Sequence, residues 1–183
     1  LPDKIKSVAI DTSLLLPDVH RLNNRSGLPK LEWHFQKPVA YVPTLDTYVI
    51  EHRPSVWYNS ADAARLGYKF KGQWAADEHR MSIGIYYGLK HEILDYEFSY
   101  LTPLYSLGKQ TVISWQSARL EGRSENQIRL ARRMFTKTLY RPPIYDFSIG
   151  FRSSFLFQEN YLPPGIVWEK GRVNTVALSW SFQ

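Results

Sequence analysis

The sequence lacks several features on which whole classes of protein depend. Its 183 residues include no cysteine, which excludes disulfides, thiolate metal ligands and cysteine nucleophiles. No stretch approaches the roughly 20 apolar residues of a membrane-spanning helix, and the mean hydropathy is −0.36. No P-loop, GxSxG or dinucleotide-binding fingerprint occurs. The sequence therefore predicts no cofactor and carries no recognisable catalytic motif.

Metal binding has no support in the sequence either. No two histidines are spaced at i, i+4, as on one face of a helix, or at i, i+2, as on one face of a strand. We interpret the histidines as turn or interface residues and predict no metal site. The five histidines are His20, His34, His52, His79 and His91.

The formal net charge of +6 is mostly scattered along the chain, and the one tight basic cluster is Arg129–Lys137. A nucleic-acid or anionic-lipid partner would call for basic residues gathered on one face. A mildly basic surface explains the composition, and we predict no nucleic-acid partner.

Alternation of apolar and polar residues is what the sequence has in abundance. Near the C-terminus, Val176, Leu178, Trp180 and Phe182 form one face of an extended strand, and small polar residues form the other. Strands in globular proteins average about 5–6 residues, whereas strands of about 9–11 residues cross a bilayer at a tilt. Pro54 indicates an edge or a bulge in the first alternating segment, because proline removes a ladder donor. The segments span 48–58, 64–74, 79–90, 93–102, 109–120, 124–140, 143–157 and 174–183.

The segment 124–140 has two interpretations. Ser124–Gln127 is a possible helix start, and Ile128, Ala131 and Phe135 fall at helical spacing. A basic amphipathic helix here would indicate a membrane surface or an acidic partner. We favour a strand, because strands with matching turns are predicted on both sides.

The polar faces of the predicted strands are unusual because they combine glycine and serine with a few long charged residues. Glycine weakens a water-facing strand, whereas the interior of a narrow barrel needs small residues and requires its charges to pair. We therefore expect the polar faces to line a barrel interior and the apolar faces to contact lipid, in a sheet that closes. The candidate interior ion-pair residues are Glu51, Arg53, Arg65, Lys69, Lys71, Arg80, Asp95, Glu97, Asp146 and Arg152.

Aromatic residues stand near the ends of the apolar faces, where a bilayer interface would accommodate an apolar ring with a polar tip. The residues predicted to form this aromatic belt are Tyr48, Tyr58, Trp74, Tyr100, Tyr145, Trp180 and Phe182.

Four stretches carry a family resemblance. The ending ALSWSFQ resembles the terminal strand signal of bacterial outer-membrane barrels, and PSVWYNSADAARLGYKFKG and LDYEFSYLTPLYSLGKQ resemble barrel strands of the outer-membrane assembly and surface-antigen superfamily. The stretch IDTSLLLPDVHRLNN is similar to the junction after the catalytic part of gluzincin aminopeptidase-like proteins, some Bacteroidota members of which carry a barrel-like tail. The zinc motif HExxH of those peptidases is absent, because no second histidine follows His91–Glu92, and the VRGF-type motif of the assembly barrels is absent too.

The alternation and the resemblance together predict an all-β protein. We expect an antiparallel up-and-down transmembrane β-barrel of about eight strands over residues 45–183, after a periplasmic or interdomain lead-in over residues 1–44. The resemblance implies a Gram-negative outer-membrane location with both termini periplasmic. It leaves open that the chain is one part of a larger protein and its barrel one part of a wider barrel. The implied partners are the lipid bilayer, the barrel-assembly machinery through the C-terminal strand, and a periplasmic domain of the same protein.

The function that the sequence favours is a non-enzymatic membrane anchor or scaffold whose interior is plugged by ion pairs. One alternative is a lipid-surface hydrolase or acyltransferase using serine and histidine at the outer rim, for which Ser55, Ser60, His52 and His91 are candidates without a specific spacing. The other is a soluble β-sandwich or lipocalin-like barrel that turns its apolar faces inward and binds a ligand.

Overall fold

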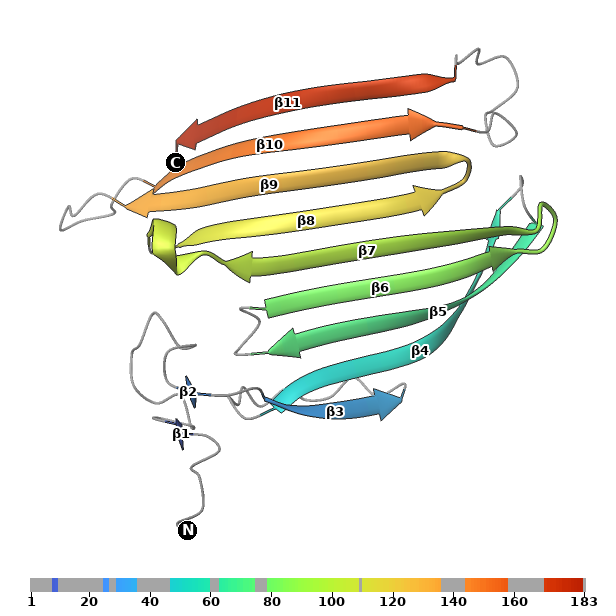
Figure 1. Cartoon of the computed structure of the whole chain (residues 1–183), viewed down its shortest axis with the longest axis horizontal. Helices are drawn as coiled ribbons and strands as arrows, with labels where there is room; N and C mark the ends of the chain where they lie inside the picture. The colour runs from blue at the N-terminus through green and yellow to red at the C-terminus, as the bar shows by residue number, and fades with distance from the viewer. Residues whose placement is uncertain are drawn as a thin grey trace, which may run out of the picture.

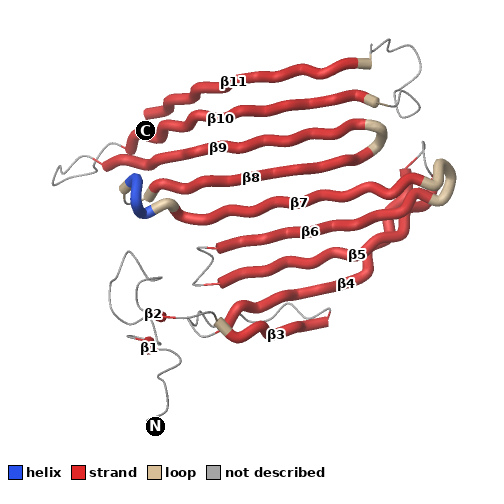
Figure 2. Tube along the Cα trace, in the orientation of Figure 1, coloured by secondary structure: helices blue, strands red, loops and turns tan. Residues whose placement is uncertain are grey.

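A computed structural model of the chain describes residues 8–9, 25–26, 29–35, 47–59, 63–74, 79–108, 110–135, 144–157 and 170–182. These residues are almost entirely β-strand, as Figure 2 shows, with a single short 3-10 helix, η2, at Tyr105–Leu107. Among the described residues, no helix has the length and hydropathy needed to cross a membrane.

One nine-stranded sheet dominates the structure, in the order β11-β10-β9-β8-β7-β6-β5-β4-β3 (Figure 1). From β5 to β11, each strand pairs antiparallel with the strand before it in the sequence, so β4 to β11 form an up-and-down meander. A separate two-stranded sheet pairs β1 (Val8–Ala9) with β2 (Arg25–Ser26). The strands of the main sheet are β3 (Lys30–Phe35), β4 (Thr47–Asn59), β5 (Ala63–Trp74), β6 (His79–Gly88), β7 (Ile93–Pro103), β8 (Thr111–Leu120), β9 (Arg123–Phe135), β10 (Ile144–Leu156) and β11 (Gly171–Phe182).

The all-β prediction is confirmed, and each of the eight alternating segments contains a strand. The ambiguous segment forms strand β9 over Arg123–Phe135, which pairs with β8 on one side and with β10 on the other. Successive residues of β9 therefore alternate between the two faces of the sheet. The edge predicted at Pro54 is also present in the described residues, since β3 pairs with β4 only as far as His52.

Strand β3 was not predicted from the sequence, and it lies within the segment assigned to the lead-in. Leu31, Trp33 and Phe35 alternate with polar residues, a signal obscured by the turn-rich sequence before it. The strand pairs with β4 in parallel and extends the sheet by one position.

The expectation of a closed barrel needs correction, because the described strands form an open sheet with β3 and β11 at its two edges. An eight-stranded barrel would pair β11 with the free side of β4. In this structure β3 occupies part of that side, over Thr47–His52. To close into a barrel, this sheet would need strand pairing at β3 and β11 that the described residues do not make.

The sheet has two chemically different faces, which the register assigns consistently from strand to strand. Large apolar side chains on one face are widely exposed; Leu94 is 60% and Leu178 is 68% exposed. On the other face, which we call the polar face, Arg65, Tyr86 and Asp95 are almost fully buried. Side chains converge on the concave side of a curved sheet, so this difference indicates that the sheet curves toward its polar face.

Candidate functional site

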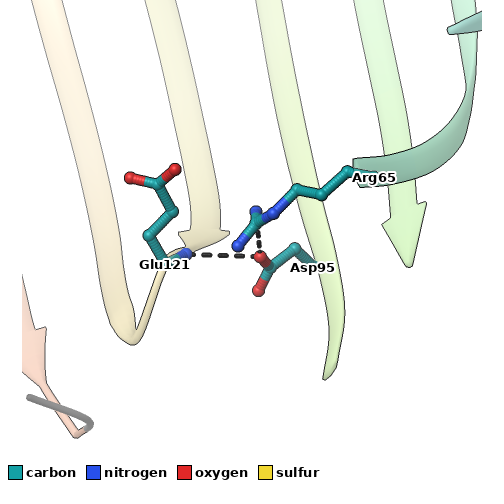
Figure 3. Close-up of polar contacts among 3 residues, drawn as sticks. All are labelled: Arg65, Asp95 and Glu121. Atoms are coloured by element: carbon teal, nitrogen blue, oxygen red, sulfur yellow. Dashed lines mark hydrogen bonds and ion pairs between the residues drawn. The ribbon is translucent and has the colours of Figure 1, made fainter. Parts of the chain in front are cut away.

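A buried ion pair is the centre of the polar face in the first half of the sheet. Arg65 on β5 donates from Nη1 to Oδ2 of Asp95 on β7 at 2.5 Å, and their side chains are 0% and 1% exposed. The same carboxylate oxygen accepts the backbone N–H of Glu121 at 3.2 Å (Figure 3). The Arg65 guanidinium also lies 5.6 Å from the ring centre of Trp57. Asp95 therefore joins β5 and β7 to the turn between β8 and β9.

The β8–β9 turn holds its backbone in the geometry that this bond needs. Glu121 and Gly122 both have positive φ, at 53° and 74°. A two-residue hairpin loop of type I′ requires positive φ at both positions, because that twist matches the flanking strands. The turn thus presents the Glu121 N–H toward Asp95.

A second group of side chains lies beside the ion pair. Tyr86 on β6 donates its hydroxyl to Glu97, and its ring stacks on Trp57 at 5.1 Å between centres with an interplanar angle of 4°. Lys69 contributes twice, with its Nζ 3.5 Å from a Glu97 oxygen and 5.5 Å from the Tyr86 ring centre. Charge, hydrogen bonding and ring stacking are therefore combined in one layer, which we call the packed polar layer: Trp57, Arg65, Lys69, Tyr86, Asp95 and Glu97.

Glycines make room for the packed polar layer. Gly67 and Gly84 stand under the Tyr86 side chain, and a Cβ at either position would collide with it. Because these positions carry no side chain, Trp57 on β4 reaches Tyr86 on β6, and Lys69 on β5 reaches Glu97 on β7. Glycine in the interior of a strand normally weakens it. Here Gly67 and Gly84 offset that cost, because the missing side chains leave the space that the packed polar layer occupies.

The structure brings together some of the predicted ion-pair residues and not others. Arg65 meets Asp95, and Lys69 meets Glu97. Asp146 and Arg152 find partners that were not among the predicted residues, namely Arg133 and Glu125. The remaining predicted residues also lie on the polar face, where the register places Lys71 opposite Glu51, Arg53 opposite Lys69, and Arg80 opposite Leu101. The missed partners Arg133 and Glu125 lie on β9, the segment whose secondary structure was ambiguous in the sequence.

The seven residues predicted to form an aromatic belt share the apolar face, as the register shows. Trp180 is 74% and Tyr58 is 79% exposed. Tyr48, Trp74 and Tyr100 lie at one end of their strands, where they line a pocket of about 350 Å³ with His79. Tyr145 and Phe182 pack against each other at 5.3 Å between ring centres.

The candidate serines and histidines of a lipid-surface enzyme do not form a catalytic arrangement in the described residues. His52 lies on the apolar face, where it stacks with Tyr68 and Phe70 and its Nδ1 is 2.7 Å from the Tyr68 hydroxyl. Ser55 is on the opposite face, three residues along the strand. His91 lies in the β6–β7 turn. Ser60 is outside the described residues.

The described residues contain no group of three or more histidine, aspartate or glutamate side chains that could hold a metal ion. The buried Arg65 and Asp95 are sealed from solvent by their own layer, so they are not placed to meet a substrate. The packed polar layer therefore has the chemistry of a structural core.

The chain matches no known family model, and no curated protein or solved structure is significantly similar to it.

Proposed function

We propose that this chain forms part of the wall of a bacterial outer-membrane β-barrel that acts as an anchor or scaffold. In this proposal the apolar face contacts lipid and the packed polar layer fills part of the interior. The observation that carries the proposal is the pairing of opposite chemistries across one sheet: an exposed apolar face on long strands and a polar face with a buried, paired charge.

The exposure of the apolar face is what favours a membrane over water. Monomeric soluble proteins rarely expose contiguous apolar patches larger than a few hundred Å². Here, exposed large apolar side chains occur on every strand of the main sheet, from Leu31 on β3 to Phe182 on β11. A bilayer would cover this face, and aromatic side chains near the strand ends would lie at interfacial depth.

Long antiparallel strands support the same proposal. Strands β4 to β11 have 10 to 13 residues each, which is long enough to cross a bilayer at a tilt. Backbone groups in lipid must all be bonded, so the free sides of β3 and β11 would need further strands, either from a longer chain or from a partner. A barrel wider than eight strands fits these two open edges.

The soluble alternative requires the apolar face to be buried inside the protein. A sandwich or lipocalin-like barrel would bury the apolar face, whereas Ile85, Val176 and Leu178 on that face are 45%, 68% and 68% exposed. Among the described residues, no second layer covers them. The membrane proposal is therefore the better account of this face.

A pair of neighbouring substitutions on β6 tests the proposal. Ile83→Arg places a charge on the apolar face, and we expect it to destabilise the protein in lipid vesicles by about 2–4 kcal/mol, because an arginine near the bilayer midplane is costly. Ser82→Arg, one residue away on the polar face, faces Ser99 and is the matched control, with a much smaller expected effect.

The measurement is the urea unfolding midpoint in vesicles, together with heat-modifiable migration of the detergent-solubilised protein. Equal effects of the two substitutions would contradict the proposal. So would a monodisperse protein that needs no detergent.

A further inference from the structure

The second half of the polar face contains a groove of about 650 Å³ that the packed polar layer does not fill. From its geometry we propose that this groove binds a soluble oxyanion, a phosphoryl or carboxylate group, clamped between Arg129 and Arg133 on β9. This goes beyond the anchoring role and does not depend on it, because it uses only residues of the polar face, whose positions are the same whatever covers the apolar face.

Small residues form the floor of the groove. Ala131, Ser148 and Ser179 share one row across β9, β10 and β11. Their small side chains leave the space that longer residues would fill. The row is flanked on one side by Arg133, opposite Asp146, and on the other by Arg129, opposite Gly150.

The two arginines stand four residues apart on one strand, on the same face. At about 3.3 Å per residue, their Cα atoms are roughly 13 Å apart, a span that two arginine side chains can close from either side of one anion. Arg133 is held in place by Asp146, to which it donates from Nε at 2.8 Å and from Nη2 at 3.2 Å. A guanidinium presents five N–H donors, so Arg133 keeps donors free beside its carboxylate partner.

Arg129 supplies the uncompensated charge. Among the described residues, its guanidinium has no carboxylate partner, whereas Arg133 and Arg152 on this part of the face each have one. Its stem passes beside Gly150, where an added Cβ would lie 3.7 Å from the Arg129 Cβ. An anion bound in the groove would therefore meet one full positive charge that no carboxylate of the described residues neutralises.

Hydroxyl groups complete the set of donors. The Ser148 and Ser179 Oγ atoms are 2.6 Å apart, and Ser148 is 6% exposed. When one hydroxyl donates to the other, the second hydroxyl keeps its own proton for a ligand. Ser181 lies at the rim, next to Asp146 in the register. Arginine forks with serine hydroxyls suit the oxygens of phosphate or carboxylate, and the single carboxylate of Asp146 is already satisfied by Arg133.

The volume of the groove indicates a ligand larger than a single phosphate ion. Small-molecule sites commonly occupy about 300–1,000 Å³, and this groove lies within that range. The proposed ligand class is therefore a small organic molecule with a phosphoryl or carboxylate group, which the groove would hold by that group.

Calorimetric titration of the detergent-solubilised protein at low salt, with inorganic phosphate, glycerol 3-phosphate and succinate as separate probes, tests the proposal and separates the two oxyanions. We expect Arg129→Gln to weaken binding of the best probe by about tenfold or more. The matched control is Arg123→Gln, which removes the same charge from the same face of β9 outside the groove. It should change the affinity by less than about twofold, because Arg123 lies about 20 Å along the strand from Arg129 and a charge at that distance in water interacts weakly with the bound group.

Ser179→Ala is the second variant, at an exposed position, and should weaken binding by about threefold through the loss of one hydroxyl. It keeps the proposal testable if Arg129→Gln fails to fold, as judged by heat-modifiable migration. Equal losses for Arg123→Gln and Arg129→Gln would show general attraction to a basic face and overturn the proposal. Absence of binding of all three probes at millimolar concentration would also overturn it. So would an affinity that is unchanged in both single variants, Ser179→Ala and Arg129→Gln.

Discussion

Strands β4–β7 and strands β8–β11 both carry ion pairs on their polar faces, but the two halves arrange them differently. In the first half, Arg65 and Asp95 are both buried. They form one ion pair that joins β5 to β7, two strands away. In the second half, the ion pairs Arg133–Asp146 and Arg152–Glu125 join neighbouring strands, and both arginines are about half exposed. Arginine–carboxylate pairs therefore belong to a packed core in one half and border a groove in the other.

Side-chain size explains the difference. The first half places Trp57 and Tyr86 on the polar face and gives them space over glycines, so rings and charges form a continuous layer. The corresponding floor of the second half is Ala131, Ser148 and Ser179, with no aromatic residue among them. A sheet of one topology can thus fill part of its polar face by adding two large rings, without any change in strand order.

The largest expected effect that tests this comparison comes from the buried pair. Asp95→Asn removes the charge that compensates the buried Arg65 guanidinium, and we expect it to lower the free energy of unfolding by about 3–5 kcal/mol. Asp146→Asn makes the same change at the exposed pair of the second half and should have little effect. The measurement is the denaturant midpoint of each variant in detergent.

The double variant Arg65→Met with Asp95→Leu sharpens the same test. Replacing a buried ion pair by apolar residues of similar volume is often neutral or stabilising, so it should recover most of the loss caused by Asp95→Asn. Similar midpoints for Asp95→Asn and Asp146→Asn would mean that the two halves do not differ in the way described.

A smaller effect is expected at the glycines. Gly67→Ala adds a methyl group where the Tyr86 ring lies, and overpacking of this kind costs about 1–3 kcal/mol. Gly150→Ala is the matched control on the polar face of the second half, where the nearest heavy atom to the added Cβ is 3.5 Å away. Thermal unfolding followed by circular dichroism should separate the two variants, and a Gly67→Ala protein as stable as Gly150→Ala would contradict the packing role of Tyr86.

The strands and their faces could be predicted because alternation over about ten residues is a local signal that the sheet does not override. The pairing of Arg65 with Asp95 was within reach for the same reason, since both residues lie on the polar face. Which carboxylate pairs with which arginine depends on the register between strands, and no local sequence pattern encodes that register. For this reason Arg133 and Glu125 were not predicted as partners of Asp146 and Arg152. The parallel strand β3 and the open edges were missed because they depend on contacts between distant segments.

The central claim is that the apolar face of this sheet contacts lipid while the polar face does not, and β10 offers the most direct test. The chain has no native cysteine, so single cysteines can be placed in turn at Phe147, Ile149 and Phe151 on the apolar face and at Gly150, Arg152 and Ser154 on the polar face. After reconstitution into vesicles, we expect a water-soluble maleimide to label the three polar-face positions and to leave the three apolar-face positions protected, in strict alternation along the strand. Equal labelling of both sets, or protection of the polar-face set instead, would contradict the account.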